Sequence, residues 1–283
     1  MLAGCSSAGS PSSQPSGSPN ASQHDFEQGT DMARIAEAGT MTVAVKFDVA
    51  GFGLTGLSDT PRGFDVEIAK IVASKLGVAA DKINWIEGLG NLREQLLESG
   101  DADMVVATYT MNDERKKRVS YVGPYYMAGQ QLMVATDDDK IDRPEFFANQ
   151  PTAKVCTNSG STNATNILKY LANESQLVLF DVISKCGDAL RTHQVSAVTG
   201  DNTTLLGLVS QSKGLFKMVG IPFTQEPYGI GIPKGDTAFC TFIAETLKEA
   251  AKSGDYEKAW KSTGGEISGA ATTPALPDLE PCS

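Results

Sequence analysis

The pattern that organises this chain begins with Thr42-Val43-Ala44-Val45-Lys46, a short run rich in strand-forming residues. A glycine-rich turn follows, and Gly63-Phe64-Asp65-Val66-Glu67-Ile68 then starts a segment whose apolar residues recur at helical spacing as far as Leu76. The next apolar runs, 83–86 and 104–107, predict two further strands with a short helix between them. An order of strand, helix, strand, helix and strand predicts a parallel sheet covered by helices.

The same order begins again in the second half of the chain. The elements expected there are strands at 153–156, 177–180 and 196–198, helices at 166–171 and 183–190, and two C-terminal helices around 239–247 and 256–260. No repeat is visible residue by residue, but the order of elements predicts two similar α/β units in succession.

Composition and charge narrow the classes of function. The chain has 283 residues, of which 34 are acidic and 24 basic, so its formal net charge is −10. This excess of acid argues against binding DNA or RNA through phosphate neutralisation, and no apolar run approaches the roughly 20 residues of a membrane-spanning helix. Two histidines leave little room for a His-rich metal site or a His-based triad. We therefore expect no nucleic acid partner, no metal and no cofactor.

The first 30 residues differ in character from the rest. Leu2-Ala3-Gly4-Cys5 precedes a stretch of Ser, Pro, Gly and Asn that cannot bury a core and is typical of a flexible tether. The four-residue string resembles the lipobox of bacterial lipoproteins, which implies lipidation of Cys5 and anchoring to the outer face of the cell membrane. The alternative is a chance cysteine in a leader.

Four cysteines remain once Cys5 is set aside, and an even number in an exported protein predicts disulfides. Four cysteines allow three connectivities. We favour Cys156–Cys186 and Cys240–Cys282, because each pair falls within one region of the sequence. No C-x-x-C is present, which argues against zinc or thioredoxin-like chemistry.

Two groups of motifs point to a known family. The first is Gly63-Phe64-Asp65-Val66-Glu67-Ile68 with the apolar positions that follow it; the second runs through Gly100-Asp101-Ala102-Asp103, residues 108–115 and Gly123-Pro124-Tyr125-Tyr126. Together they resemble the bacterial extracellular solute-binding proteins of family 3, and within it the actinobacterial glutamate-binding members. The resemblance extends from about residue 40 to residue 264.

The resemblance implies a two-lobed fold of the type II periplasmic-binding-protein class. Each lobe is a mostly parallel sheet flanked by helices, and two hinge strands near 130–134 and 222–232 join the lobes. We expect residues 1–30 to form the tether, residues 31–132 and 226–266 lobe 1, residues 133–225 lobe 2, and residues 267–283 a C-terminal tail. Such a protein is a monomer that delivers its ligand to an ABC permease and ATPase complex.

A free amino acid presents an α-carboxylate and an α-ammonium, and a buried site must pair both groups. Arg115 offers a planar fork that suits a carboxylate, and Ser161 and Thr162 stand at a predicted helix start, where N–H groups favour the same anion. By resemblance, Asp201 receives the ammonium. Thr108 and Thr110 would complete the site with a backbone carbonyl and a hydroxyl. Taken singly, Asp201 could instead cap a helix, and Arg115 could lie on a solvated helix face with Lys116, Lys117 and Arg118.

Two further cationic side chains are expected to determine which amino acid the site prefers. Lys46 follows the first strand and Arg93 precedes a short helix, and acid-binding members of the family look similar at both places. Both therefore favour aspartate or glutamate. The alternative is that Lys46 pairs with Asp48, and Arg93 with Glu94 or Glu98, on the surface, where such pairs contribute only ~0–1 kcal/mol.

The aromatic residues of the sequence have two expected places, the ligand site and the core. Phe52, Tyr109 and Tyr126 are candidates for packing on the ligand's carbons, and packing in the core or at the lobe surface is an equal alternative for Tyr126. Trp85 and Trp260 are expected in the core. The sequence predicts a binding protein and not an enzyme. A dehydratase acting on prephenate-like acids and an amino-acid sensor without a transport role are the alternatives.

Overall fold

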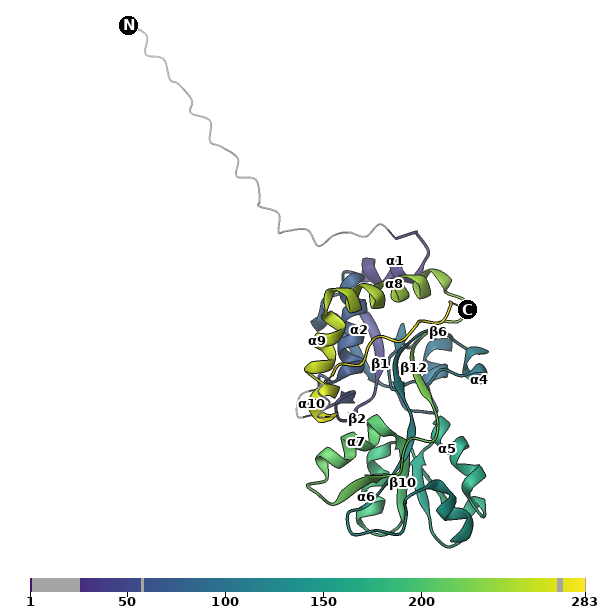
Figure 1. Ribbon diagram of the computed structural model, residues 1–283. Helices are drawn as coiled ribbons and strands as arrows, with labels where there is room; N and C mark the ends of the chain where they lie inside the picture. Colours follow the sequence, from purple (N-terminus) through teal and green to yellow (C-terminus); the bar gives the residue numbers. More distant parts are fainter. Residues whose placement is uncertain (2–25, 57–58, 269–271, 283) are drawn as a thin grey trace.

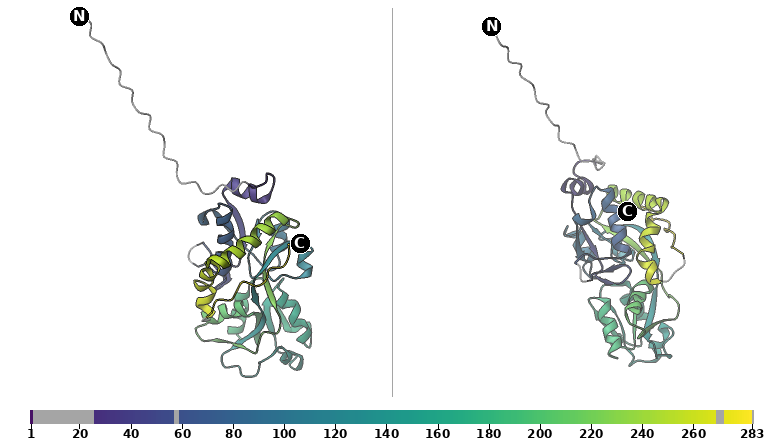
Figure 2. Two further views of the ribbon diagram at one scale, coloured as in Figure 1. Left: turned by 45° about the horizontal axis from the view of Figure 1, so that its top comes forward. Right: turned by 90° about the vertical axis from the view of Figure 1, so that its left-hand side faces the viewer.

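The computed structural model describes residue 1 and residues 26–56, 59–268 and 272–282. Two lobes lie one above the other in Figure 1, and both further views in Figure 2 show the same division. Cys5 and most of the expected tether fall outside the described residues.

The first lobe is built on a five-stranded sheet in the order β4-β1-β5-β12-β6. Its strands are β1 (Met41–Val45), β4 (Ile83–Glu87), β5 (Met104–Val105), β6 (Ser120–Ala128) and β12 (Glu226–Ile232). β1 runs parallel to β4 and β5, whereas β12 is antiparallel to β5 and β6. The helices of this lobe are α1 (Asp31–Ala38), α2 (Phe64–Lys75), α3 (Arg93–Glu98), α4 (Asp113–Lys116), α8 (Thr237–Ser253), α9 (Asp255–Lys261) and α10 (Gly264–Ser268).

The second lobe has its own five-stranded sheet in the order β11-β7-β10-β8-β9. Its strands are β7 (Gln130–Ala135), β8 (Val155–Asn158), β9 (Leu177–Phe180), β10 (Ala197–Asp201) and β11 (Phe216–Val219). Helices α5 (Thr162–Ile167), α6 (Ile183–Arg191) and α7 (Asn202–Gln211) belong to this lobe, which lies below the first in Figure 1.

The chain passes between the sheets at two places. Gly129 separates β6 in the first sheet from β7 in the second, and residues 220–225 lead from β11 back to β12. A Cβ at Gly129 would lie 2.7 Å from Thr224 O, so the two crossing segments touch and glycine is needed there. The lobe limits given above remain a prediction, although β7 places the first crossing at residue 129.

The helical pattern of residues 64–76 is confirmed by α2, which ends before Gly77, at φ +81°. Its apolar residues are buried except for Ile71, which is partly buried. Two expectations were inaccurate. The helix expected at 166–171 starts earlier, at Thr162, because the Ser161 side chain accepts a hydrogen bond from Ala164 N and caps it. No strand was expected around Pro124, yet Pro124 lies inside β6. β6 is an edge strand, where proline is tolerated.

Two disulfides link the favoured cysteine pairs. Cys156 in β8 joins Cys186 in α6, and Cys240 in α8 joins Cys282 near the C-terminus. The first bond fixes a helix to a strand within the second lobe. The second holds the C-terminal segment against the first lobe, as the yellow trace in Figure 1 shows. Among the described residues, no helix is long and apolar enough to cross a membrane.

Candidate ligand-binding site

A cavity of about 30 Å³ lies between the lobes, where β1 and β10 end. Its wall consists of Lys46, Val49, Arg93, Thr108, Thr110 and Arg115 from the first lobe and Asn158, Ser161, Thr162, Asn163, Ile183, Asp201 and Thr204 from the second. The eight polar and charged residues that the sequence placed in a ligand site are all in this wall. Of the three aromatic candidates, Tyr109 lies directly behind it against two arginines.

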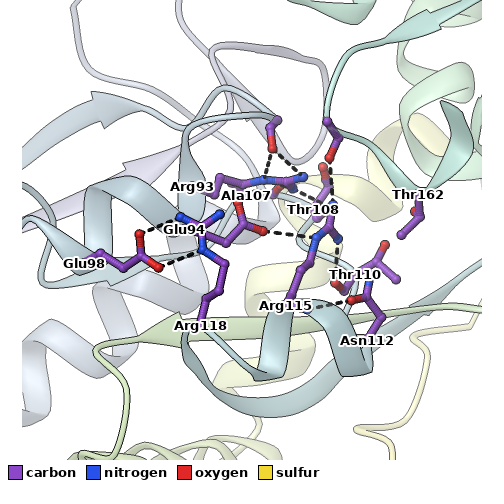
Figure 3. A network of polar contacts seen from close by, with 12 residues as sticks. Arg93, Glu94, Glu98, Ala107, Thr108, Thr110, Asn112, Arg115, Arg118 and Thr162 are labelled. Atoms are coloured by element: carbon purple, nitrogen blue, oxygen red, sulfur yellow. Dashed lines mark hydrogen bonds and ion pairs between the residues drawn. The ribbon is translucent and has the colours of Figure 1, made fainter. Parts of the chain in front are cut away.

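Arg115 reaches across the cavity from α4. Its Nη1 donates to Thr110 O at 2.7 Å, its Nη2 donates to Gly160 O of the other lobe at 2.8 Å, and its Nε lies 3.2 Å from Glu94 Oε1. Figure 3 shows this arrangement. A guanidinium has five N–H groups, so these contacts leave one on each terminal nitrogen. These two N–H groups remain for an acceptor such as a carboxylate.

The other cations in the run containing Arg115 lie outside the site. Lys117 pairs with Glu114 and Arg118 pairs with Glu98, on side chains that are largely exposed. Lys116 is bound to Glu280 of the C-terminal segment. The structure therefore separates Arg115, which is 8% exposed, from its neighbours on the solvated side.

Arg93 is a second buried guanidinium beside Arg115. It donates to Ala107 O at 3.1 Å and more weakly to Gly90 O and Thr108 O. Its Cζ lies 4.3 Å from the centre of the Tyr109 ring, and that of Arg115 lies 5.0 Å from the same centre. Burial, and then the charge of Arg115, lower the pKa of Arg93. Two like charges held this close favour an anion between them.

The expected alternative for Arg93 is not what the structure shows. Glu94 pairs with Arg115 and Glu98 pairs with Arg118, whereas Arg93 contacts backbone carbonyls and an aromatic ring. Among the ion pairs of the described residues, none joins Arg93 to a carboxylate.

Lys46 stands at the end of β1 and is 4% exposed. Its Nζ lies 3.6 Å from Asp48 Oδ1, so the pair expected from sequence exists, but it is buried and not at the surface. Burial lowers the pKa of Lys46, and the charge of Asp48 opposes that shift.

Asp201 is the acidic group of the cavity wall. It holds the position before α7, but its side chain makes no capping hydrogen bond. Instead its carboxylate accepts from Asn163 Nδ2 at 2.9 Å and from the Tyr228 hydroxyl at 2.6 Å. Burial, and then the charge of Glu226, raise the pKa of Asp201 to about 6. A cation beside this carboxylate would stabilise its charged form.

Ser161 and Thr162 stand where the α5 helix begins. The Ser161 hydroxyl donates to Asn158 O and accepts from Ala164 N. The Thr162 hydroxyl donates to Glu226 Oε2 at 2.6 Å, which ties this helix to the hinge strand β12. Both hydroxyls thus have protein partners.

Thr108 and Thr110 continue from β5 along the cavity. Thr108 has a left-handed backbone, with φ +44°, which is unusual for a β-branched residue. Its N–H donates to Asp65 Oδ2 at 2.7 Å, and the other Asp65 oxygen accepts from the Tyr125 hydroxyl. Burial raises the pKa of Asp65 to about 7. Sequence reasoning did not name Asp65 as a support of the site, although it belongs to the first family motif.

The remaining aromatic candidates lie elsewhere. Tyr126 stacks on Trp260, with ring centres 5.2 Å apart, and Phe52 packs edge-on against both. These residues border a separate cavity of about 170 Å³ near the hinge. Trp260 is buried, as expected, whereas Trp85, also expected in the core, is only partly buried against it.

Comparison with known proteins agrees with this architecture. The profile of the bacterial extracellular solute-binding proteins, family 3, matches residues 41–265. The chain belongs to this family, and the resemblance inferred from its motifs is confirmed.

Relatives and solved structures give the same result. The glutamate-binding protein GluB of Corynebacterium efficiens is 34% identical over 253 residues, which is 86% of this chain and 85% of that protein. The ABC transporter glutamine-binding protein GlnH of Bacillus subtilis is 33% identical over 262 residues, 92% of this chain and 91% of its own. An ancestral arginine-binding protein bound to glutamine superimposes with a TM-score of 0.73 at 32% identity, covering 80% of this chain and 97% of that one. The two-lobed α/β fold is therefore confirmed.

Proposed function

We propose that this protein is the receptor of an ABC-type amino-acid importer and that it captures an acidic amino acid, L-glutamate or L-aspartate, by lobe closure. The observation that carries the proposal is the set of three buried cations, Lys46, Arg93 and Arg115, around one cavity. Buried cations need anionic partners. Asp48 and Glu94 supply two of them, so a ligand with a second carboxylate supplies what Arg93 lacks.

Each part of the ligand has a partner in this arrangement. The α-carboxylate binds to the Arg115 fork and the first turn of α5, and the α-ammonium binds to Asp201. Thr108 and Thr110 contribute a carbonyl and a hydroxyl at the same end. The acidic side chain then points toward Lys46 and Arg93. Tyr109 holds both guanidinium groups in place from behind.

The relatives leave two classes of ligand, one with an acidic side chain and one with an amide side chain. GluB is a glutamate-binding protein and GlnH a glutamine-binding protein, at 34% and 33% identity. An amide facing a buried, poorly compensated cation costs about 2–5 kcal/mol relative to a carboxylate. This difference favours the acid. A dehydratase would need a general acid and a general base beside the substrate. No observation on this cavity supports such a pair, so we propose binding without catalysis.

The location of the protein follows from the same proposal. A lipidated Cys5 would anchor a monomer to the outer face of the cell membrane, with the Ser/Pro-rich segment as tether. There the receptor would meet the permease and ATPase complex of the importer.

Calorimetric titration of variants tests the roles of the cations. Arg115→Ala should abolish binding of every amino acid, because the α-carboxylate is common to all. Lys46→Ala or Arg93→Ala should mainly remove the preference for acids over amides. Lys117→Ala is the matched control, since Lys117 lies in the same run but is exposed and paired with Glu114. Unchanged glutamate affinity in Arg115→Ala would refute the assignment.

A further inference from the structure

Asp48 is a carboxylate of one lobe that bonds to the other lobe. It lies in β2 (Asp48–Val49), two residues after Lys46 at the end of β1. Its Oδ2 accepts a hydrogen bond from Ser184 N at a distance of 3.1 Å. Ser184 belongs to the first turn of α6 in the second lobe, 136 residues away in sequence.

The helix that donates this bond has no side-chain cap at its own N-cap residue. Val182 occupies the N-cap position of α6 with the extended backbone of a capping residue, φ −126° and ψ 149°, but makes no side-chain cap bond. A valine side chain carries no acceptor. The first N–H groups of a helix need acceptors and favour negative charge. Asp48 provides both from the opposite lobe.

The contact is linked to the ligand cavity on both sides. In the first lobe, the second oxygen of Asp48 is buried and lies 3.6 Å from Lys46 Nζ. In the second lobe, the Cys156–Cys186 disulfide joins α6 to β8, and β8 leads into Ser161 of the cavity wall. Ile183, the first residue of α6, lines the cavity itself.

We propose that Asp48 is a positioning residue that couples the ligand site to lobe closure, by capping α6 only when the lobes are together. The proposal rests on the proposed function in one respect, that the lobes close on a ligand. When the lobes separate, this bond breaks, and the carboxylate and Ser184 N each bind water instead. When they meet, a charge-assisted bond forms in a nearly dry interface. Its contribution is therefore common to every ligand that closes the lobes.

A double-mutant cycle measured by calorimetry tests the proposal. Asp48→Ala should weaken the binding of L-glutamine by about tenfold, because a hydrogen bond to a charged group contributes roughly that much. The loss for L-glutamate should be smaller, because the same change frees Lys46 for an acidic side chain. Val182→Ser gives α6 its own cap in both the open and the closed state. In that background, Asp48→Ala should weaken binding clearly less. Asp48→Asn, which keeps an acceptor but no charge, should fall between wild type and Asp48→Ala.

Two outcomes would overturn the proposal. One is an equal loss from Asp48→Ala with and without Val182→Ser. The other is an unchanged L-glutamine affinity in Asp48→Ala, which would mean that Asp48 acts only through Lys46 on an acidic side chain. Thermal unfolding of the ligand-free variants checks that each remains folded. Failure of the proposed function is a separate result, because it would appear as glutamine binding tighter than glutamate in the wild type, where the cycle can still be measured.

Discussion

Under the proposed function Asp201 receives the ammonium group of the ligand, so its protonation state bears directly on binding. Its carboxylate is buried and shares its surroundings with Glu226, which together raise its pKa to about 6. The Tyr228 and Asn163 hydrogen bonds favour the charged form and limit that shift. Only the ionised carboxylate pairs with an ammonium group, so a ligand selects the deprotonated protein and lowers the pKa of Asp201 further.

Amino-acid affinity should therefore depend on pH with a definite sign. It should be full above about pH 6 and should fall as the pH drops through the raised pKa of Asp201, by up to about tenfold per pH unit. Binding near pH 6 should also release protons. Calorimetry between pH 5 and 7.5, in buffers of different ionisation enthalpy, measures both. An affinity independent of pH over this range, with no proton release, would show that Asp201 does not receive the ammonium.

Sequence identified the charged members of the site but not their supports. Lys46, Arg93 and Arg115 could be named because charged residues at motif positions are conspicuous. The contacts that hold them come from distant parts of the chain, as with Gly160 O, which lies 45 residues beyond Arg115. The Asp65 bond to Thr108 likewise spans 43 residues. Such pairs follow from how the two sheets are placed, which no local pattern encodes.

At the scale of elements, the loops before α3 and α5 bring the two lobes together. A Cβ at Gly90, before α3, would lie 2.5 Å from Ser159 O, and a Cβ at Gly160, before α5, would lie 2.6 Å from the backbone of Asn91. The absence of side chains at these two glycines therefore allows the backbones to touch.

Gly90→Ala should hold the lobes apart without harming either one. Its methyl group meets only the opposite lobe within the nearest contacts, and its backbone is not in the left-handed region. Affinity for all amino acids should fall by about tenfold or more, while the thermal midpoint of the ligand-free protein stays nearly unchanged. Gly56→Ala is the matched control, because a Cβ there has nothing within 4 Å. Wild-type affinity in Gly90→Ala would mean that these loops do not meet in the bound state.

Most elements were predictable, and the exceptions have local causes. Strong periodicity located α2, α6 and α8, while a strand containing proline, β6, could not be recognised because its edge position depends on the whole sheet. The start of α5 agrees with the helix start expected at Ser161 and Thr162, although the apolar periodicity alone placed the helix only from residue 166.

At the scale of the whole molecule, the net charge is negative, whereas the three cations around the cavity are positive. The chain carries a formal charge of −10, so its overall field repels an anionic ligand rather than steering it inward. Under the proposed function, selectivity for an acid would come from Lys46, Arg93 and Arg115, which are buried where screening by salt is weak. An affinity that changes little between low and moderate salt is consistent with this arrangement.

The measurement that bears most directly on the proposed function is the ratio of the dissociation constants of L-glutamate and L-glutamine. Both ligands share the α-carboxylate and α-ammonium and have nearly the same size, so only the side-chain charge differs. Calorimetry on the wild-type protein at pH 7.5 should show glutamate binding more tightly by about thirtyfold or more, the lower end of the cost of leaving a buried cation poorly paired. Glutamine binding as tightly as glutamate, or more tightly, would contradict the assignment of the buried cations to an acidic side chain.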